Sequence, residues 1–307
     1  MTNNNECVMS VKGLTKIFKC GFFNPEYTVA AKEISFDIEK GKIISLIGES
    51  GSGKTTVGKL ILKLINPTEG EISYKGKNIT EIEDKDELKD YYRRVQGIFQ
   101  DPFATFNPLY RVDRVFDMIF DSFDLGYEDK DQAINEALSD VNLNPDRTLG
   151  KFPHQLSGGQ LQRLLIARAL LMDVDILIAD ELISMLDAST RIGVLNLLIE
   201  TCKKNGMSVI FITHDLNLGY YISDKSLIMY KGRLVEKGAT KKIYENATHP
   251  YTKMLFEAVP EIGERWDSDE EFLPEKIIND VKEFYNKNEG KGFVEIEEDH
   301  SVLFSDK

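Results

Sequence analysis

Three short stretches of this 307-residue chain carry residues suited to binding phosphate and activating water. The first is GESGSGKTT, from Gly48 to Thr56, which matches G-x-x-x-x-G-K-[ST]. Its glycines let successive backbone N–H groups turn inward, and the helix expected after them favours an anion at its N-terminus. Lys54 would reach the β and γ phosphates, and Thr55 would place its hydroxyl on Mg²⁺. The predicted phosphate-binding residues are Gly48, Ser50, Gly51, Ser52, Gly53, Lys54, Thr55 and Thr56.

The second stretch is ILIADE, in which four apolar residues lead to Asp180 and Glu181. The apolar run predicts a buried strand, and ligands bind at the carboxyl ends of the strands in open α/β sheets. Asp180 suits a direct or outer-shell role on Mg²⁺, and Glu181 is placed to polarise an attacking water. The alternative is that the two carboxylates cap the next helix.

The third stretch is LSGGQ, where Ser157, Gly158 and Gly159 precede an apolar helical pattern. These residues predict a second anion-binding helix terminus, far along the chain from the first. A plainer interpretation of the local conformation is a serine cap followed by a flexible glycine pair. One chain has no obvious use for two such sites. Two chains packed head to tail would let each LSGGQ close over the γ-phosphate held by its partner.

The elements around these stretches alternate between strand and helix. KIISLIG (42–48), VDILIAD (174–180) and MSVIFITHD (207–215) predict buried strands, and helical patterns lie between them. This alternation is typical of a parallel sheet with crossover helices. Residues 108–172 instead predict nearly continuous helix, which indicates a helical insertion in an α/β core.

Composition limits the partners and the compartment. The chain has 38 Lys and Arg against 51 Asp and Glu, a formal charge of −13, which argues against nonspecific binding to nucleic acid or anionic lipid. Its three cysteines lack metal-ligand spacing, and no apolar run approaches the roughly 18 residues of a membrane span, so we expect a cytoplasmic protein. Residues 261–307 contain 15 acidic and 6 basic residues, and their stretches WDSDEEF and VEIEEDH predict solvated surface.

Taken in order, the motifs resemble those of the nucleotide-binding subunit of ABC transporters over residues 8–260. The matching pieces are the phosphate-binding loop, IFQDP with Gln100, LSGGQ, ILIADE, SMLD with Asp187, and ITHD with His214. The resemblance implies a P-loop ATPase core of the α/β class with an antiparallel β subdomain. It also implies a head-to-tail dimer that sandwiches ATP. With the composition and the apolar pattern, it gives a nucleotide-binding domain at 8–260 with an inserted helical subdomain at about 108–172, followed by an acidic C-terminal extension at 261–307.

The same resemblance assigns roles to single residues. Gln100 would contact Mg²⁺ and the attacking water, and His214 would contact the γ-phosphate, so that the catalytic set is Glu181, His214 and Gln100. Phe18 would stack on adenine with Val29 against the ring, although an aromatic there could equally belong to the core. The implied metal-binding set is Thr55, Gln100 and Asp180. The nucleotide site is completed by Ser157, Gly158, Gly159, Gln160 and Asp187.

Three longer stretches, GIFQDPFATFNPLYRV, FPHQLSGGQ and NATHPYTKMLFEAVPEI, resemble the oligopeptide and dipeptide importer branch, which also includes oligosaccharide importers. This likeness implies a subunit on the cytoplasmic face of the membrane that binds two transmembrane permease subunits. A second ATP-binding subunit is implied, with a heterodimer favoured over a homodimer. An extracellular solute-binding protein would act indirectly.

The chain also departs from the branch. The cysteine cluster that many members carry near the C-terminus is missing after Cys202, so we expect no iron–sulfur cluster. Leu182 and Ile183 replace the usual Pro-Thr after Glu181, which predicts a less constrained loop. Aromatic residues after Gln100 suit either core packing or a coupling surface for the membrane subunit: Phe103, Phe106 and Tyr110.

Two other classes use part of this motif set. A P-loop metabolite kinase would use Lys54 and Asp180 but would leave LSGGQ and His214 without a role. A soluble ABC ATPase acting on DNA or ribosomes would use every motif. Such proteins usually have paired cassettes, long coiled coils or basic surfaces, and this acidic chain with one cassette has none of these in its sequence.

Overall fold

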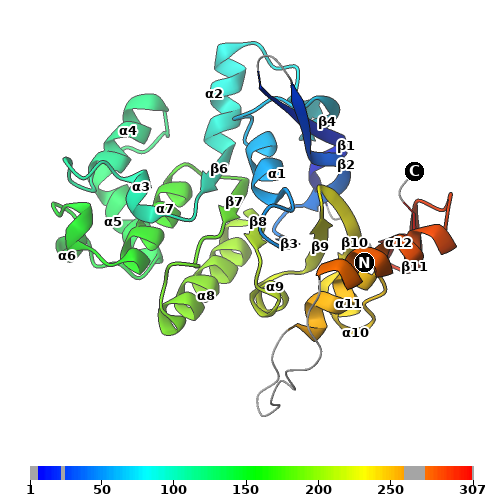
Figure 1. Cartoon of the computed structure of the whole chain (residues 1–307). Coiled ribbons are helices and arrows are strands. Elements are labelled where there is room, and N and C mark those ends of the chain that lie inside the picture. Colours follow the sequence, from blue (N-terminus) through cyan, green and yellow to red (C-terminus); the bar gives the residue numbers. More distant parts are fainter. Residues whose placement is uncertain (1–5, 22–24, 259–273, 306–307) are drawn as a thin grey trace, which may run out of the picture.

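Two β-sheets form the centre of the computed structural model, which describes residues 6–21, 25–258 and 274–305 (Figure 1). The larger sheet has the strand order β11-β12-β10-β9-β3-β8-β7-β6, and the smaller has the order β2-β1-β4-β5. The strands are β1 (Cys7–Cys20), β2 (Glu26–Glu39), β3 (Ile43–Ile47), β4 (Glu69–Tyr74), β5 (Lys77–Asn78), β6 (Val95–Ile98), β7 (Ile176–Asp180), β8 (Ser208–Thr213), β9 (Lys225–Tyr230), β10 (Arg233–Ala239), β11 (Phe293–Glu297) and β12 (His300–Leu303). The helices are α1 (Lys54–Ile61), α2 (Lys85–Arg94), α3 (Pro102–Thr105), α4 (Arg114–Ser122), α5 (Lys130–Asp140), α6 (Pro145–Thr148), α7 (Gly158–Leu171), α8 (Ala188–Asn205), α9 (Leu216–Ile222), α10 (Thr240–Glu245), α11 (Pro250–Glu257) and α12 (Pro274–Lys287), with one 3₁₀ turn at Pro153–Gln155.

The predicted parallel sheet is confirmed. Every residue of β3, β7 and β8 is buried, as expected for strands covered on both faces. The parallel register pairs Ile47 with Thr213 and Asp180 with Ile212, so these three strands end at one edge. The residues that follow them, including the glycine-rich loop, Glu181 and His214, are thereby brought together.

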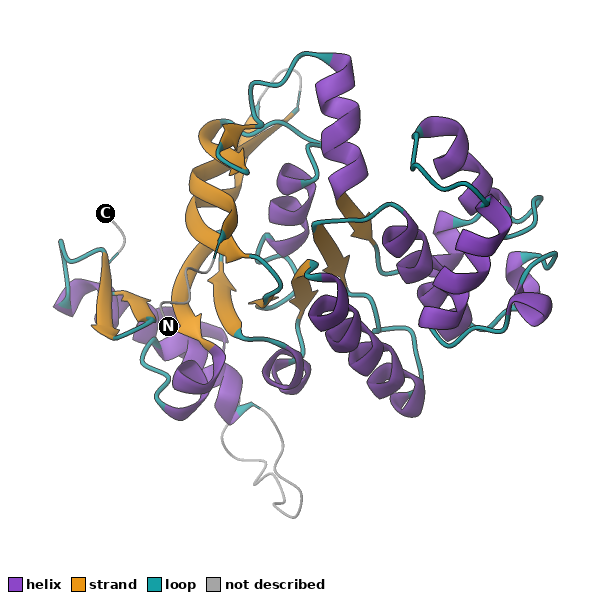
Figure 2. Ribbon diagram, turned by 180° about the vertical axis from the view of Figure 1, so that it is seen from behind, coloured by secondary structure: helices purple, strands orange, loops and turns teal. Residues whose placement is uncertain are grey.

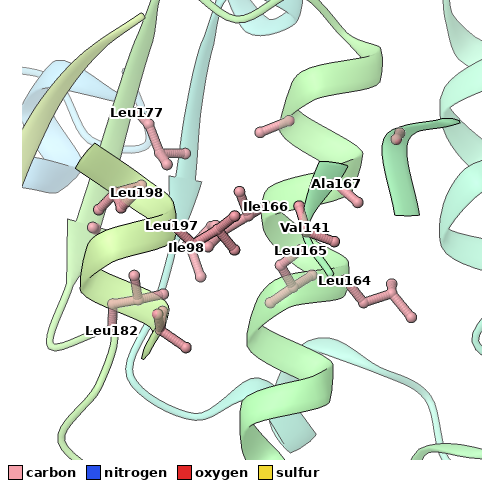
Figure 3. Close-up of a cluster of buried hydrophobic side chains, with 14 of the residues drawn as sticks. Ile98, Val141, Leu164, Leu165, Ile166, Ala167, Leu177, Leu182, Leu197 and Leu198 are labelled. Carbon is pink, nitrogen blue, oxygen red and sulfur yellow. The ribbon is translucent and has the colours of Figure 1, made fainter. Parts of the chain in front are cut away.

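Apolar side chains join the helical insertion to this sheet. Figure 3 shows Leu165 and Ile166 of α7 on the side of Leu197 of α8 and of Ile98 at the end of β6, and Leu164 on the opposite side of α7. All five are buried in one core cluster. Helix α4 buries Phe116 and Ile119, α5 buries Ile134 and Leu138, and both helices lie on one side of the molecule (Figure 1). The insertion is therefore packed on the core through α7.

The smaller sheet is antiparallel, as the resemblance implied. Its strands β1, β2 and β4 bury one set of alternating apolar residues in a second core cluster, which also contains Val57, Leu60 and Ile61 of α1. The helix that follows the glycine-rich loop is thus held between two sheets. Figure 2 shows this sheet and α1 side by side from behind.

The C-terminal extension is part of the main sheet, which the sequence did not predict. The stretch 294–300, expected to be solvated surface, forms most of β11 and the first residue of β12, and β12 pairs with β10. Its acidic side chains are exposed as expected, but His300 is fully buried, because it faces the carboxylate of Glu236 across the pair. The other acidic stretch, 266–272, lies outside the described residues.

Candidate active site

The glycine-rich loop joins the end of β3 to the first turn of α1. Gly53 has a φ of 104°, and a Cβ there would lie 2.1 Å from the carbonyl oxygen of Ala30. A Cβ on Gly48 would lie 2.2 Å from the carbonyl oxygen of Met229. Both positions therefore exclude any larger residue. The loop leaves the helix N-terminus free of a side-chain cap, as an anion-binding loop requires.

Lys54 lies across the inside of this loop. Its ammonium donates hydrogen bonds of 2.7 Å to the carbonyl oxygens of both Gly48 and Glu49. Burial lowers the pKa of Lys54, and the nearby carboxylates of Glu181, Asp180 and Glu49 oppose that shift. The ammonium also donates to the Ser52 hydroxyl at 3.4 Å. A buried ammonium held by neutral oxygens is suited to exchange them for phosphate oxygens, which carry charge.

Asp180 is 5% exposed, and its Oδ1 atom has no hydrogen-bond partner. Burial raises the pKa of Asp180, in spite of a hydrogen bond from the Thr55 side chain. A buried carboxylate oxygen without a partner is costly, and it fits a hard cation beside the Thr55 hydroxyl. Neither Asp180 nor Glu181 caps the next helix, because α8 begins at Ala188 and is capped by Asp187.

Glu181 and His214 form a hydrogen-bonded pair at the ends of adjacent strands, with 2.7 Å between Glu181 Oε1 and His214 Nδ1. The backbone of Glu181 has a left-handed φ of 54°, which is uncommon for a residue with a side chain. Leu182 and Ile183 are 0% and 2% exposed, and they pack in the core. The loop after Glu181, predicted to be less constrained without proline, is instead anchored by apolar burial.

One open cleft of about 720 Å³ contains most of these groups. Gln100, Glu181 and His214 line it together with the glycine-rich loop. The sequence did not identify four other lining residues: Thr28, Ala30, Glu49 and Leu255. Leu255 belongs to α11, far from the loop in sequence, so no local spacing signals its presence.

The two residues expected at the adenine ring are placed differently. Val29 is 45% exposed and lines the cleft. Phe18 is 37% exposed, pairs with Thr28 in the β1–β2 register, and is not among the lining residues. Lys16 places its ammonium over the Phe18 ring, 5.2 Å from the centroid. Phe18 is thus a partly exposed aromatic near the cleft rather than a core residue.

The LSGGQ stretch starts α7 with a capping box. Ser157 Oγ accepts from the Gln160 N–H at 3.2 Å, and Gln160 Oε1 accepts from the Ser157 N–H at 2.9 Å. A Cβ on Gly159 would lie 2.4 Å from Cγ2 of Thr190, so this glycine lets α7 approach the start of α8. Asp187 caps α8, and hydrogen bonds from Ser189 and Thr190 lower its pKa.

Within the described part of the chain, this second motif does not line the cleft that contains Lys54. Ser157 is exposed, while Gly158 and Gly159 pack against the segment before α8 and its first turn. The structure therefore brings the phosphate-binding loop, Asp180, Glu181, Gln100 and His214 together, and it presents Ser157 elsewhere on the surface.

Comparison with known proteins gives consistent matches. Residues 31–184 match the family described as ABC transporter, and residues 235–295 match the oligopeptide/dipeptide transporter C-terminal region. The chain is 42% identical to the oligopeptide transport ATP-binding protein OppF of Bacillus subtilis, over 80% of this chain and 81% of that protein. It is 37% identical to the dipeptide transport ATP-binding protein DppF of Haemophilus influenzae, over 86% and 82%. A solved structure similar to it is the dimeric, post-hydrolysis state of the ATP-binding cassette MJ0796 bound to ADP and Pi, with a TM-score of 0.66 and 29% identity over 76% of this chain and 98% of that chain.

Proposed function

Because the chain belongs to the ABC transporter family and is an ATPase of that family, we propose that it powers the import of oligopeptides or dipeptides. The relatives named above are ATP-binding proteins of oligopeptide and dipeptide transport, and residues 235–295 match the C-terminal region of such transporters. These names favour a peptide over the oligosaccharide that the branch also allows. The observation that carries the proposal is the cleft lined by Lys54, Glu181 and His214, with the buried carboxylate of Asp180 beside Thr55 and Lys54.

In this proposal the phosphates of ATP lie in the glycine-rich loop. Lys54 leaves the carbonyl oxygens of Gly48 and Glu49 and pairs with the β and γ phosphates. The ring of Phe18 turns toward the base from the edge of the cleft, and Val29 lies against it. Thr28 and Ala30, which neighbour Val29 on β2, line the same side of the cleft.

A magnesium ion fits the residues beside the phosphates. Thr55, Asp180 and Gln100 would hold it, and the partnerless Oδ1 of Asp180 is the feature that calls for a cation. When bound, the ion neutralises charge on the phosphate oxygens. In the described residues there is no cluster of three or more His, Cys, Asp or Glu that would form a separate metal centre.

Glu181 is the residue placed to orient and polarise the attacking water. Its carboxylate is 19% exposed, and it is held in the cleft by His214. His214, at 62% exposed, is free to turn toward the γ-phosphate once nucleotide fills the cleft. The same histidine thus restrains the general base and senses the γ-phosphate.

The second motif requires a partner chain in this proposal. Ser157 and the N-terminus of α7 would contact the γ-phosphate held by the other chain of a head-to-tail dimer. ATP favours the closed dimer because its contacts span both chains, and hydrolysis removes them. Gly158, Gly159, Gln160 and Asp187 shape this surface. The partner is a second, related ATPase subunit, with a homodimer as the alternative.

The membrane subunits would bind beside the helical insertion. A groove of about 610 Å³ there is lined by residues of α3, α4 and the segment between them, including Phe106, Tyr110 and Met118. Phe106 is buried, whereas Phe103, Tyr110 and Met118 are exposed. Of the three aromatic residues considered in the sequence, Phe106 therefore belongs to the core. The exposed Phe103 and Tyr110 suit contact with a helix of a permease subunit.

The described residues contain no helix that is both long and apolar enough to span a bilayer. From the relatives, which are ATP-binding proteins of peptide transport, we infer attachment at the cytoplasmic face of the membrane through two permease subunits, with the solute-binding protein acting from outside.

Co-purification from native membranes tests the proposal. Tagged wild-type and Glu181→Gln chains are isolated in ATP, and every retained protein is identified by mass spectrometry. Recovery of two multi-span proteins and a second ATPase subunit would support an importer, and a co-purified solute-binding protein would supply the ligand for a peptide-binding assay. Recovery of ribosomes, DNA or soluble partners alone would contradict the transport function while leaving the ATPase intact.

A further inference from the structure

Helix α11 contacts the phosphate-binding loop through one hydroxyl group. Tyr251 is fully buried, and its Oη atom accepts a 3.0 Å hydrogen bond from the backbone N–H of Glu49. Leu255, one turn further along α11, lines the cleft that contains Lys54. The C-terminal region thus reaches the cleft at two points.

The backbone of Glu49 makes hydrogen bonds that hold the shape of the loop. Its carbonyl oxygen accepts from the Ser52 N–H at 3.2 Å and from Lys54 Nζ at 2.7 Å. The residue before it, Gly48, has no room for a side chain, because Met229 lies against it. Tyr251 therefore holds the one residue whose carbonyl oxygen positions both the turn and the lysine.

A buried network fixes Tyr251 in place. His249, which caps α11, accepts from the Tyr251 N–H through Nδ1 at 3.2 Å. The N–H groups of Thr248 and His249 donate to the two carboxylate oxygens of Glu236, at 2.9 and 3.1 Å. His300 Nε2 lies 2.8 Å from the same carboxylate. Its four side chains, Glu236, His249, Tyr251 and His300, are all fully buried.

This network runs without interruption from β12 to the phosphate-binding loop. Strand β12 supplies His300, β10 supplies Glu236, and the first turn of α11 supplies Tyr251. The ring of Tyr251 also packs on Tyr230, with 4.3 Å between the centroids, at the end of β9. A displacement of β12 would therefore reach the loop through rigid, packed groups.

We propose that Tyr251 is a positioning residue for the phosphate-binding loop, and that the C-terminal strand β12 sets its position through His300 and Glu236. The proposal rests on the phosphate site proposed above and extends it to the C-terminal region. ATP affinity then depends on the docking of β12. When the Glu49 N–H loses its acceptor, the loop conformation that contains it is weakened, which corresponds to about tenfold in affinity.

Equilibrium binding of a fluorescent ATP analogue to the full-length chain tests this proposal. Tyr251→Phe removes the hydroxyl and keeps the ring, so we expect the Kd to rise about tenfold. In steady-state assays KM should rise by a similar factor while kcat changes less than about twofold, because Glu181 and His214 are untouched. His300→Gln should raise the Kd in the same direction. Tyr127→Phe is the matched control, since its hydroxyl bonds the Leu171 carbonyl in the helical insertion.

The outcomes separate this inference from the proposed site. Lys54→Ala should weaken binding in every case; if it does not, the phosphate site itself is wrong. If Lys54→Ala weakens binding while Tyr251→Phe stays within twofold of wild type, Tyr251 has no positioning role. If Tyr251→Phe weakens binding and a folded His300→Gln does not, the part of the proposal that involves β12 is overturned. Circular dichroism melts establish that each variant is folded.

Discussion

At the scale of single residues, the Glu181–His214 pair leads to a prediction that binding of ATP and its hydrolysis can be separated. Glu181 lies in the cleft but does not belong to the phosphate-binding loop. Glu181→Gln keeps the shape of the side chain and an oxygen that can bond His214, but it removes the carboxylate that we propose as the general base. We expect kcat to fall by roughly a hundredfold or more, with the Kd for ATP within about twofold.

Single-turnover hydrolysis and nucleotide binding by the same preparation check this prediction. Glu200→Gln, at an exposed position of α8, is the matched control and should behave as wild type. Hydrolysis by Glu181→Gln at the wild-type rate would show that the base is another residue.

Asp180 is expected to lower the stability of the ligand-free chain, which buries its charge, while it supports binding of Mg²⁺. Asp180→Asn removes that charge and keeps an acceptor for Thr55. We expect the Tm of the ligand-free chain to rise, while the Mg²⁺ concentration for half-maximal ATPase activity rises about tenfold or more. Differential scanning fluorimetry and a Mg²⁺ titration measure the two effects.

Asp121→Asn, at an exposed site in the helical insertion, should change neither quantity. A lower Tm together with unchanged Mg²⁺ dependence would mean that Asp180 is a structural carboxylate only.

At the scale of elements, Gly159 lets α7 pack against α8. Gly159→Ala places a methyl group against Cγ2 of Thr190, so we expect a loss of about 1–3 kcal/mol in the free energy of unfolding. Thr190→Ser removes that methyl group and keeps a hydroxyl for Asp187. The double variant should therefore regain most of the lost stability in urea unfolding, measured as a double-mutant cycle.

ATPase activity distinguishes packing from a phosphate role. If Gly159 serves packing alone, activity returns with stability in the double variant. If α7 contributes its N-terminus to the partner's nucleotide, activity stays low after stability is restored. If the two substitutions change the free energy of unfolding additively, so that Thr190→Ser does not restore the stability lost in Gly159→Ala, the contact between Gly159 and Thr190 is contradicted.

The cap of α11 makes stability depend on pH. Burial lowers the pKa of His249 to about 3, below its ordinary value of 6.5. The folded state therefore keeps His249 neutral while the unfolded chain takes up a proton, so stability is lost as the pH falls from 6.5 toward 3. Asn is also a good N-cap, and His249→Asn should remove this pH-dependent loss of stability, which is about 1 kcal/mol between pH 6.5 and 5.5.

Urea unfolding of both chains at several pH values gives the difference. His154→Asn, at an exposed position, is the control and should leave the pH dependence unchanged. Parallel pH curves for wild type and His249→Asn would show that His249 is protonated alike in both states.

The elements also show which features the sequence could predict. Buried apolar runs identified β3, β7 and β8, and parallel topology then required their carboxyl ends to meet, which placed Glu181 and His214 beside the glycine-rich loop. The contact between Tyr251 and Glu49 has no such signal, because it depends on where α11 docks. The same holds for Leu255 in the cleft.

The acidic composition of the C-terminal extension predicted solvated surface, and the strands β11 and β12 were missed because they too depend on contacts distant in sequence. The acidic residues of VEIEEDH are exposed, as the composition indicated, but strand pairing is decided by the residues between them. His300 turns inward because Glu236 provides a buried partner on β10. Neither residue alone predicts the other, since 64 positions separate them.

At the scale of the whole molecule, the surface position of Ser157 leads to a prediction about assembly. Asp and Asn cap helices as well as Ser does, so both substitutions should preserve the start of α7. Ser157→Asp adds a negative charge where the partner's γ-phosphate would lie, and like charges repel at that distance. In the Glu181→Gln background, we expect ATP to drive association of the Ser157→Asn chain but not of the Ser157→Asp chain.

Sedimentation velocity, with and without ATP, measures this association for the chain alone and with its co-purified second ATPase subunit. ATP binding to the isolated chain should be the same in both variants, because Ser157 does not line the chain's own cleft. If both isolated variants bind ATP equally, the effect of the added charge on association is specific to the nucleotide held by the partner. Equal association of the Asp and Asn variants would place the γ-phosphate away from α7 and contradict head-to-tail closure. Loss of ATP binding in the isolated Asp variant would instead place Ser157 at its own nucleotide, and a single chain would then hold the complete site.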